Sequence, residues 1–490
     1  MVILIVVNEP KEWPFDTPNV DVVGARSYLT GPEYSDMRGV KVFNLCRSYR
    51  YQSAGYYVSL LAEARGHRPL PSVTAIQDLK SPTMVRLVSD ELEDLIQKSL
   101  APIQSDRFTM SIYFGRNLAK RYDRLALHLF NLFPAPLLRA QFVRDKRWQL
   151  RNINAIPASE VPESHQSFVV RVASEHFAGR RGRVKRRART RFDLAILCHS
   201  GDPEPPSDDK ALARFVKAAE SVGLSAELIT RDDYARLAEF DALFIRETTA
   251  VNHFTYRFSR RATSEGLVVI DDPESIVKCA NKVYLAELLA RHKVPIPRTI
   301  VVHRDNARSV ADELGFPCVL KKPDSAFSLG VTKVDSQEEF CVQIKRLLAE
   351  SDLVVAQEFL PTTFDWRIGI LDRQPLYACK YYMARYHWQI IRRDGEGKCR
   401  YGKWETLPVE LAPGRAVRVA LKAANLIGRG LYGVDVKQSG DHFYVIEVND
   451  NPNIEAGVED AVLKQELYRR IMSVLVRRIE QRKAWTATHD

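Results

Sequence analysis

The chain of 490 residues is too long for one hydrophobic core, and its length predicts two to four domains. With 45% hydrophobic and 27% charged residues it has the composition of a soluble globular protein, and no stretch is long enough for a membrane span. Its seven cysteines are scattered and form no C-x-x-C pair, which argues against a zinc site and a disulfide framework. A reducing cytoplasm is the expected location.

The net charge of +11 originates in one segment rather than in a basic surface. Residues 180–191 hold eight basic side chains and no acidic one, which leaves 64 basic and 61 acidic side chains elsewhere. The simpler interpretation is a solvated linker. The alternative is docking on a polyanion such as RNA or an acidic protein.

The first 178 residues predict an α/β domain without a recognisable catalytic motif. Strand-like runs, a helix that closes on Gly66, and further helical patterns follow one another. The expected strands are 2–7, 21–29 and 40–46, the expected helices are 54–66 and patterns over about 85–140, and two or three further strands are expected between 148 and 173.

The next region alternates strands with a helix, which predicts a small doubly wound unit with a parallel sheet. The expected strands are 192–200, 225–230, 240–248 and 267–276, with a helix over 209–224.

From Cys279 onward strand pairs predominate. We expect helices over 281–294, 336–350 and 415–430, and strands over 318–324, 331–334, 353–360, 365–371 and 375–382, followed by a hairpin over 431–448.

The two strands of that hairpin carry hard oxygen ligands. Glu447 and Asn449 are two residues apart and therefore share a strand face. Asp435 joins them on that face if the loop has three or five residues, and lies on the opposite face if it has two or four. Because Gly440 favours a three-residue loop with one left-handed residue, we expect a magnesium site made of Asp435, Glu447 and Asn449.

Two lysines point to an anionic ligand nearby. Lys282 begins a helix, where backbone N–H groups already favour anions. Lys321 ends a strand and precedes a turn of small residues, and such a turn can bring backbone amides close to phosphate oxygens. The strand end at 357–360 offers backbone hydrogen bonds to a flat base. Asp365 and Arg367 share a strand face, where they would serve a sugar hydroxyl and an anionic oxygen.

These motifs, in this order over about residues 193–475, resemble the ATP-grasp superfamily, and most closely the RimK-like carboxylate–amine (glutamate) ligases. The resemblance implies an α/β ATP-grasp fold, in which two α+β subdomains clamp ATP, preceded by a small doubly wound α/β domain and an extra N-terminal α/β domain. The predicted division is 1–178 as an accessory domain, 179–191 as a basic linker, 192–278 as a pre-ATP-grasp domain and 279–480 as the catalytic domain.

The resemblance also implies roles for individual residues. Lys321 and Arg367 would be catalytic, with Arg367 facing the carboxylate and its acyl phosphate. One or two Mg²⁺ (or Mn²⁺) ions would be held by Asp435, Glu447 and Asn449. The residues expected to bind ATP are Lys282, Lys321, Ser328, Gly330, Gln357, Glu358, Phe359, Leu360 and Asp365.

Two regions depart from the family pattern. The phosphate loop is poor in glycine, with Gly330 alone beside Ser325 and Ser328. Residues 383–408 do not match the substrate region of the RimK-like ligase, and they carry basic side chains, which suits an acidic carboxylate such as glutamate, aspartate or a peptide C-terminus. Those basic residues are Arg385, His387, Arg392, Arg393, Lys398, Arg400 and Lys403.

Three other functions stay open: another ATP-dependent phosphoryl transferase on the same scaffold, a nucleotide-responsive RNA- or ribosome-binding protein that uses 180–191, and a degenerate fold without catalysis. The substrates would be small-molecule or peptide carboxylates and amines, with no membrane partner. Family members commonly assemble into homo-oligomers. The sequence leaves the two substrates and the role of residues 1–178 undetermined.

Overall fold

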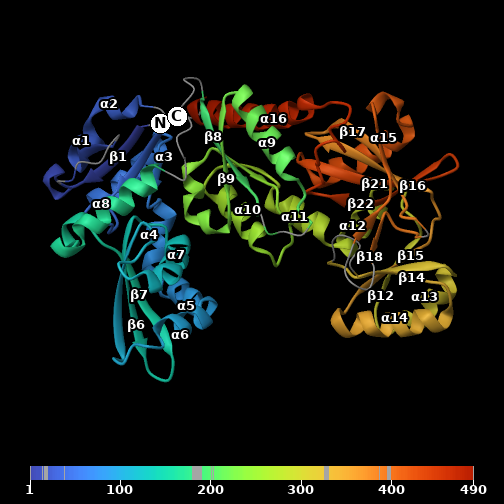
Figure 1. Ribbon diagram of the computed structural model, residues 1–490, viewed down its shortest axis with the longest axis horizontal. Coiled ribbons are helices and arrows are strands. Elements are labelled where there is room, and N and C mark those ends of the chain that lie inside the picture. Colours follow the sequence, from blue (N-terminus) through green and yellow to red (C-terminus); the bar gives the residue numbers. More distant parts are fainter. Residues whose placement is uncertain are drawn as a thin grey trace. The chain divides into compact units, whose positions relative to one another are not determined.

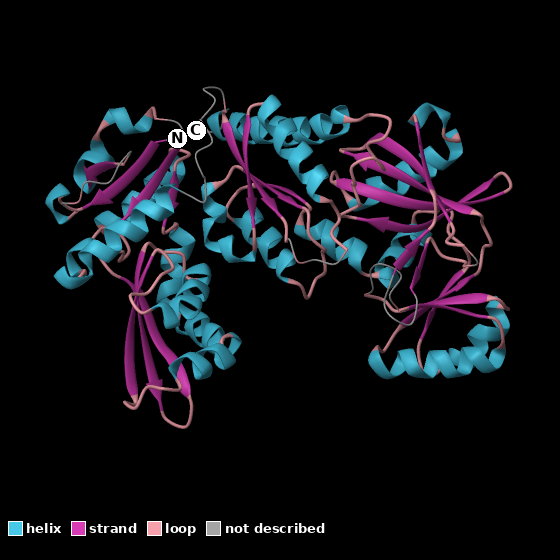
Figure 2. Ribbon diagram, viewed as in Figure 1, coloured by secondary structure: helices cyan, strands magenta, loops and turns pink. Residues whose placement is uncertain are grey.

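The computed structural model describes residues 2–13, 15, 20–37, 39–178, 190–199, 201, 204–324, 330–385, 387–393 and 399–488. They form two compact units, Met1–Arg191 with Asp232–Phe240, and Phe192–Arg231 with Asp241–Asp490 (Figures 1 and 2). Residues 179–189 of the basic run lie outside the described part. Within the described part, no helix combines the length and the apolar character that crossing a membrane requires. The four-part domain division stays a prediction.

Unit 1 begins with a parallel sheet in the order β2-β1-β3-β4. Its elements are β1 (Val2–Val7), η1 (Pro10–Glu12), β2 (Asp21–Gly24), α1 (Ala25–Thr30), α2 (Pro32–Ser35), β3 (Val40–Asn44), α3 (Ala54–Ala64), β4 (Arg68–Leu70) and α4 (Val73–Lys80). The expected strand over 21–29 is wrong in its second half, because the chain turns into α1 after Gly24. Ala25 and Tyr28, three residues apart, form the buried side of this helix.

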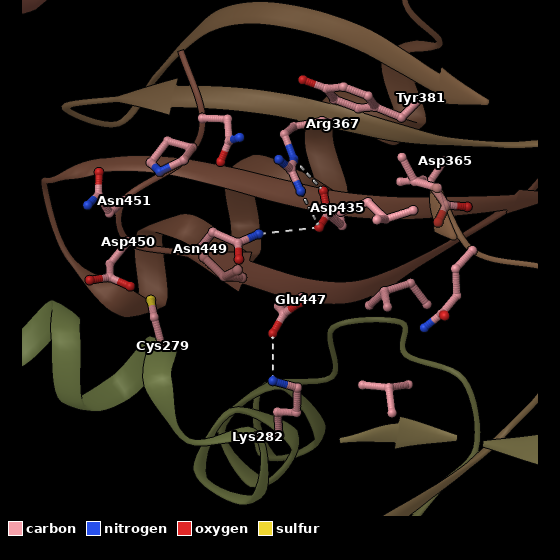
Figure 3. Close-up of a pocket in the computed structure, with 18 of the residues that line it drawn as sticks. Cys279, Lys282, Asp365, Arg367, Tyr381, Asp435, Glu447, Asn449, Asp450 and Asn451 are labelled. Carbon is pink, nitrogen blue, oxygen red and sulfur yellow. Dashed lines mark hydrogen bonds and ion pairs between the residues drawn. The ribbon is translucent and has the colours of Figure 1, made fainter. Parts of the chain in front are cut away.

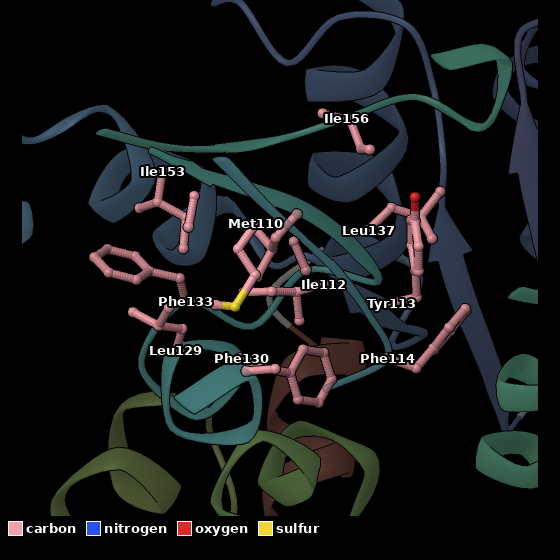
Figure 4. Packing of buried hydrophobic residues seen from close by; sticks show 14 of the residues in the cluster. Met110, Ile112, Tyr113, Phe114, Leu129, Phe130, Phe133, Leu137, Ile153 and Ile156 are labelled. Atoms are coloured by element: carbon pink, nitrogen blue, oxygen red, sulfur yellow. The ribbon is translucent and has the colours of Figure 1, made fainter. Parts of the chain in front are cut away.

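The rest of unit 1 is an antiparallel sheet, β5-β6-β7, packed with helices. The elements are α5 (Pro82–Glu91), α6 (Glu93–Leu100), β5 (Arg107–Tyr113), η2 (Lys120–Tyr122), α7 (Asp123–Leu132), β6 (Leu137–Arg144), β7 (Trp148–Ala155), η3 (Ala158–Glu160) and α8 (Glu163–Ala178). Figure 4 shows the core, in which Met110 and Ile112 of β5 pack with Leu129 and Phe133 of α7 and its C-cap.

Two expectations for this region are wrong. The helical region over 85–140 is interrupted by β5 and by the start of β6. The strands expected up to residue 173 reduce to β7, because the chain then forms α8. The buried Val169, Val172 and Ala173 of α8 follow a helical spacing of three to four residues rather than an alternation.

Unit 2 begins with a parallel sheet in the order β11-β10-β8-β9, as predicted. Its elements are β8 (Phe192–Leu197), α9 (Asp209–Ser221), β9 (Leu224–Ile229), β10 (Ala242–Ile245), α10 (Phe254–Ser264), β11 (Val268–Ile270), α11 (Pro273–Ala280) and α12 (Lys282–Arg291), and η4 (Arg231–Glu239) lies almost entirely in the segment that belongs to unit 1. The C-terminal helix α16 (Gln465–Thr488) packs on α9, where Tyr468 meets Phe215.

The two parallel sheets are an internal repeat that the sequence reading missed. Both have the same strand order, and α3, α4 and α5 begin 200 positions before α10, α11 and α12. Ser59 Oγ donates to the carbonyl of Pro71 at 2.7 Å, and Ser259 Oγ donates to the carbonyl of Asp271 at 2.6 Å. The repeat escapes notice because few side chains are shared while the backbone pattern is kept.

The remainder of unit 2 contains two antiparallel sheets with helices, which are the two predicted α+β subdomains. The first, in the order β12-β15-β13-β14, comprises β12 (Thr299–Val302), α13 (Ala307–Leu314), β13 (Cys318–Lys321), β14 (Val331–Val334), α14 (Gln337–Glu350) and β15 (Val354–Glu358). The second, in the order β20-β17-β16-β21-β22, comprises β16 (Phe364–Leu371), β17 (Gln374–Tyr382), β20 (Trp404–Leu407), η5 (Val409–Leu411), α15 (Gly414–Ile427), β21 (Leu431–Ser439) and β22 (His442–Asn449). A separate pair is β18 (Ile391–Arg393) with β19 (Cys399–Tyr401).

The five-stranded sheet has one apolar and one polar face. Ile368, Val434 and Val448 are fully buried and belong to a core that includes Ala420 and Ala424 of α15. The residues between them on the same strands include charged side chains. Because successive side chains of a strand point to opposite faces, one face of the sheet is polar and the other packs on the apolar core.

The hairpin of β21 and β22 departs from the expected geometry in two ways that cancel. Its loop has two residues, Gly440 and Asp441, because Ser439 pairs with His442, so the three-residue loop is wrong. A one-residue bulge in the register, which skips Ile446, then sets Asp435 directly opposite Glu447. The carboxylates therefore share a face despite the short loop.

Candidate active site

Unit 2 contains a cavity of about 960 Å³ lined by both antiparallel sheets and by loops of the preceding parallel sheet. This volume is typical of small-molecule sites. Eleven of the thirteen predicted site residues line it: Lys282, Lys321, Gln357, Glu358, Phe359, Leu360, Asp365, Arg367, Asp435, Glu447 and Asn449. Gly330 is not among the lining residues, and Ser328 lies outside the described part of the chain.

The predicted metal ligands are close together and are paired with cations (Figure 3). Arg367 Nε and Nη2 donate to the two carboxylate oxygens of Asp435 at 2.7 and 2.9 Å. Asn449 Nδ2 donates to the same carboxylate at 3.3 Å, and Lys282 Nζ lies 3.0 Å from Glu447 Oε1. In this structure, lysine and arginine compensate the charge of the two acidic side chains.

The donor set suits magnesium. Two carboxylates and an amide offer only oxygen ligands, which Mg²⁺ prefers, and they leave coordination positions for water or phosphate oxygens. Within the described residues, no three or more His, Cys, Asp or Glu side chains are arranged to hold a metal, which is consistent with a set that contains only two carboxylates. An ion here would depend on the nucleotide for further ligands.

Glu447 is the acidic centre of this arrangement. Burial acts to raise its pKa, but Lys282 and Lys321 outweigh that effect, and the pKa is lowered overall. The carboxylate is therefore ionised at neutral pH and available to a cation.

Lys321, at the end of β13, is almost fully buried. Its pKa is lowered to about 8, mainly by burial, and the positive charges of Lys282 and Lys437 also lower it. Its ammonium donates to Gln357 Oε1 at 2.8 Å, and Gln357 in turn donates to Thr299 at 2.8 Å. A cation held at this energetic cost is typical of a site that binds an anionic ligand.

Lys437 is a site residue that the sequence reading missed. Its ammonium donates to Asp365 Oδ1 at 2.8 Å and to Thr362 Oγ1 at 2.6 Å, and it lines the cavity. Burial raises the pKa of Asp365, and Lys437 partly offsets that rise. Its position two residues after Asp435 on the same strand was an available signal, since alternation gives both the same face.

Arg246, at the end of β10, holds the segment that follows the metal ligands. Its buried guanidinium donates to Ser207 Oγ at 3.0 Å, Asn451 Oδ1 at 2.6 Å, and the carbonyls of Pro206 and Pro452 at 2.5 and 2.8 Å. The parallel sheet therefore fixes where the chain goes after β22. No sequence signal distinguished this arginine from the others.

Gly433 permits this return of the chain. A Cβ at Gly433 would lie 2.7 Å from the Cβ of Pro452, closer than real side-chain contacts. Glycine at this position of β21 thus lets the segment after β22 pack directly against the strand.

Among the side chains that the structure describes in the basic segment 383–408, those that line the cavity are neutral. The lining residues of this segment are Trp388, Gln389, Ile390, Ile391, Gly402 and Trp404. Arg385, His387 and Lys403 are not in the lining, and the side chains of Arg392, Arg393, Lys398 and Arg400 lie outside the described part of the chain. The link between this segment and an acidic substrate therefore stays a prediction.

Comparison with known proteins agrees with this geometry. Residues 279–473 match the model of the RimK-like ATP-grasp domain, and residues 25–172 match that of the RimK-like ATPgrasp N-terminal domain. The fold and the matched domain define an ATP-grasp ligase, a class that uses ATP and Mg²⁺ to form amide bonds. The chain belongs to the RimK-like family.

Two curated relatives are ligases. The alpha-aminoadipate–LysW ligase LysX of Saccharolobus solfataricus is 26% identical over 38% of this chain and 67% of its own length. A probable alpha-L-glutamate ligase of Vibrio vulnificus is 24% identical over 46% of this chain and 74% of its own length. Among solved structures, D-alanine–D-alanine ligase from Bacillus anthracis aligns with a TM-score of 0.46 at 16% identity, over 59% of this chain and 99% of that one.

Proposed function

We propose that this ligase joins an acidic amino acid, or a peptide with an acidic carboxylate, to an amine through an acyl phosphate made from ATP. The observation that carries the proposal is the charge arrangement of one cavity. Lys282, Lys321 and Arg367 line it together with Asp435 and Glu447. The same cavity therefore holds cationic side chains suited to phosphates and carboxylates suited to a metal ion.

The first step needs charge neutralisation, because an anionic carboxylate must attack an anionic γ-phosphate. Lys282 and Lys321 would contact the phosphates, and Arg367 would orient the carboxylate and its acyl phosphate. Asp435, Glu447 and Asn449 would hold one or two Mg²⁺ ions, which would supply further charge neutralisation for the transferred phosphoryl group.

The nucleotide base would lie at the end of β15. This strand ends at Glu358, and Phe359 and Leu360 continue along the cavity wall. Ser328 and Gly330 would serve the phosphates. Gly330, directly before β14, has a φ of +73°, and its carbonyl accepts from Lys322 N at 2.9 Å. Asp365 would accept from the ribose.

The acidic substrate class is supported by the names of the relatives, which specify α-aminoadipate and L-glutamate for those proteins. The test is ADP release, with mass spectrometry of the products, over a panel of acidic, neutral and basic amino acids and peptides. We expect glutamate-like carboxylates to stimulate turnover. The expected product is the acid joined to the amine by one amide bond. Stimulation by neutral or cationic acids alone would contradict the substrate class, and a phosphorylated product without an amide would indicate a phosphoryl transferase.

Substitutions of two neighbouring lysines, one inside the cavity and one outside it, serve as a control for this experiment. Lys321→Met should abolish stimulated ADP release, whereas Lys322→Met, at a half-exposed neighbour paired with Glu350, should leave it within about 3-fold of the unchanged chain. Equal losses would show that the assay reports stability rather than the site.

The basic run 180–191 is proposed as a linker, with polyanion docking as the alternative. Deleting it should leave turnover of free substrates intact. Loss of RNA binding on deletion, measured at two salt concentrations, would instead identify it as a docking segment.

A further inference from the structure

Tyr381 and Glu459 form a hydrogen-bonded pair in the cavity that the roles above do not use. Tyr381 lies on β17, and its ring packs beside Arg367, with the guanidinium carbon 5.2 Å from the ring centroid (Figure 3). The Tyr381 hydroxyl donates to Glu459 Oε1. Both residues line the cavity, so the pair adjoins the arginine assigned to the reacting carboxylate.

Glu459 is held firmly in place. It is 1% exposed, and its second oxygen, Oε2, accepts from the backbone N–H of Glu455 at 2.8 Å. A buried carboxylate is costly unless it is well paired, so a purely structural role would be served better by an uncharged side chain.

The charged and titratable groups facing Glu459 lie on β16 and β17 and directly after β10. They are Arg246 after β10, Arg367 on β16, and Tyr377, Cys379 and Tyr381 on β17. Burial raises the pKa of Glu459 to about 7, and hydrogen bonds from the Glu455 backbone and from Tyr381 limit the rise. A group with this pKa exchanges protons readily near neutral pH.

The proposed function creates a need for such a group. An amine substrate is protonated at neutral pH, and an ammonium has no lone pair with which to attack an acyl phosphate. Something in the site must remove a proton after the amine binds.

We propose that Tyr381 and Glu459 form the proton relay that activates the amine. The ammonium gives one proton to Tyr381 Oη while the tyrosine passes its own proton to Glu459. The nitrogen lone pair then forms the C–N bond, the bond from the acyl carbon to the phosphate oxygen breaks, and the departing phosphate takes the second N–H proton. Amide, hydrogen phosphate and a protonated Glu459 remain. The inference rests on the proposed ligase function.

The test compares two nucleophiles with the same carboxylate donors, L-glutamate, L-aspartate and a peptide ending in glutamate. Hydroxylamine is neutral at about pH 7.5 and needs no base, whereas ammonium must lose a proton. We expect Tyr381→Phe and Glu459→Gln to keep hydroxamate formation and ADP release with hydroxylamine within about 3-fold. Amide formation from ammonium should fall by about 10²- to 10³-fold.

A similar pair on the same strand provides the control. Tyr382, the next residue of β17, donates to the exposed Glu405 at 3.0 Å and does not line the cavity. Tyr382→Phe and Glu405→Gln should change neither product by more than about 2-fold.

The pH profile separates a relay from a structural contact. In the two relay variants the rate with ammonium should rise about tenfold per pH unit up to about pH 9, as free ammonia becomes available. Parallel loss of both products, unchanged amide formation, or a flat difference across pH would overturn the relay. Absence of both products with the unchanged chain would overturn the proposed function, and the relay with it.

Discussion

The two parallel sheets of this protein have the same framework and different chemistry. In each copy, a serine on the first of the three recurring helices (α3 or α10) donates to a carbonyl just beyond the last strand, at 2.7 Å from Ser59 and 2.6 Å from Ser259. In each, a polar side chain caps the third helix: Ser81 accepts from Met84 N, and Asn281 accepts from Tyr284 N.

The first residue of that third helix marks the difference. Pro82 begins α5, whereas Lys282 begins α12. Lys282 makes one contact through its side chain and one through its backbone. Its ammonium pairs with Glu447, and its backbone N–H donates to the Pro323 carbonyl at 2.9 Å. Proline has neither donor, so the first copy keeps the helix start and lacks the contacts that Lys282 makes with Glu447 and Pro323.

The two copies share their framework more closely than their chemistry. The framework depends on helix caps and buried strands, which many sequences satisfy. The candidate site depends on single side chains at fixed positions. Four changes test this difference, and the strongest is given first.

Glu447→Gln should have the largest effect. It removes the carboxylate paired with Lys282 and one predicted metal ligand, so we expect turnover to fall by about 10³-fold. ADP release measured over a magnesium titration checks this. Activity within about 3-fold of the unchanged chain, at any magnesium concentration, would remove Glu447 from the metal site.

Lys282→Met should lower kcat/KM for ATP by about 10²-fold, because one cation predicted to bind phosphate is lost while the hydrogen bond from the backbone N–H to Pro323 is kept. The reciprocal change, Pro82→Lys in the first copy, should alter neither kcat/KM nor ATP binding. An effect of similar size in both copies would contradict the assignment of the chemistry to the second copy.

Lys321→Met should stabilise the protein while abolishing activity. Burial lowers the pKa of Lys321 to about 8, below the value of about 10.4 for an unfolded lysine. The unfolded chain therefore binds more protons than the folded chain between these pH values, and the stability of the lysine chain rises with pH across that window. Below about pH 8 the free-energy cost of burying the charged Lys321 is present in full. We expect about 2 kcal/mol of stabilisation at pH 7, after the lost hydrogen bond to Gln357, shrinking towards pH 10.

Urea unfolding of the lysine and methionine chains at the two pH values measures this difference. A destabilised methionine variant at pH 7 would show that the lysine is well solvated or fully paired without a ligand.

Ser59→Ala and Ser259→Ala should give the smallest effects. Each removes the buried hydrogen bond to the carbonyl, which corresponds to about 1 kcal/mol of unfolding free energy. Ser59→Ala also removes the bond that Ser59 Oγ accepts from Asn44 Nδ2 at 2.9 Å, so we expect the larger loss for Ser59→Ala. Thermal unfolding of both variants checks the pair. A larger loss for Ser259→Ala would mean that the two frames are not held in the same way.

Much of the site could be predicted because its residues occupy ends and faces of regular elements. Lys321 ends β13, Lys282 begins α12, and Glu447 and Asn449 alternate on β22, as the local patterns indicate. Arg246 and Glu459 could not be predicted, since they act through partners far away in the chain, such as Asn451 and Tyr381.

Elsewhere the predictions of secondary structure were wrong where tertiary packing outweighed the local preference of the residues. The segment after Gly24 has strand-like residues, yet it forms α1 because Ala25 and Tyr28 are buried on one helical side. The internal repeat was hidden because helix starts, caps and buried strands recur without recurring side chains.

The family and most of the element order follow from local spacing and residue type, and the same patterns predict which side chains bear the chemistry. How Asp435 joins Glu447 depends on the tertiary structure. The two-residue loop alone would separate them, and the bulge at Ile446 restores the pairing. A register is fixed by all the contacts of a sheet together, so no local pattern specifies it.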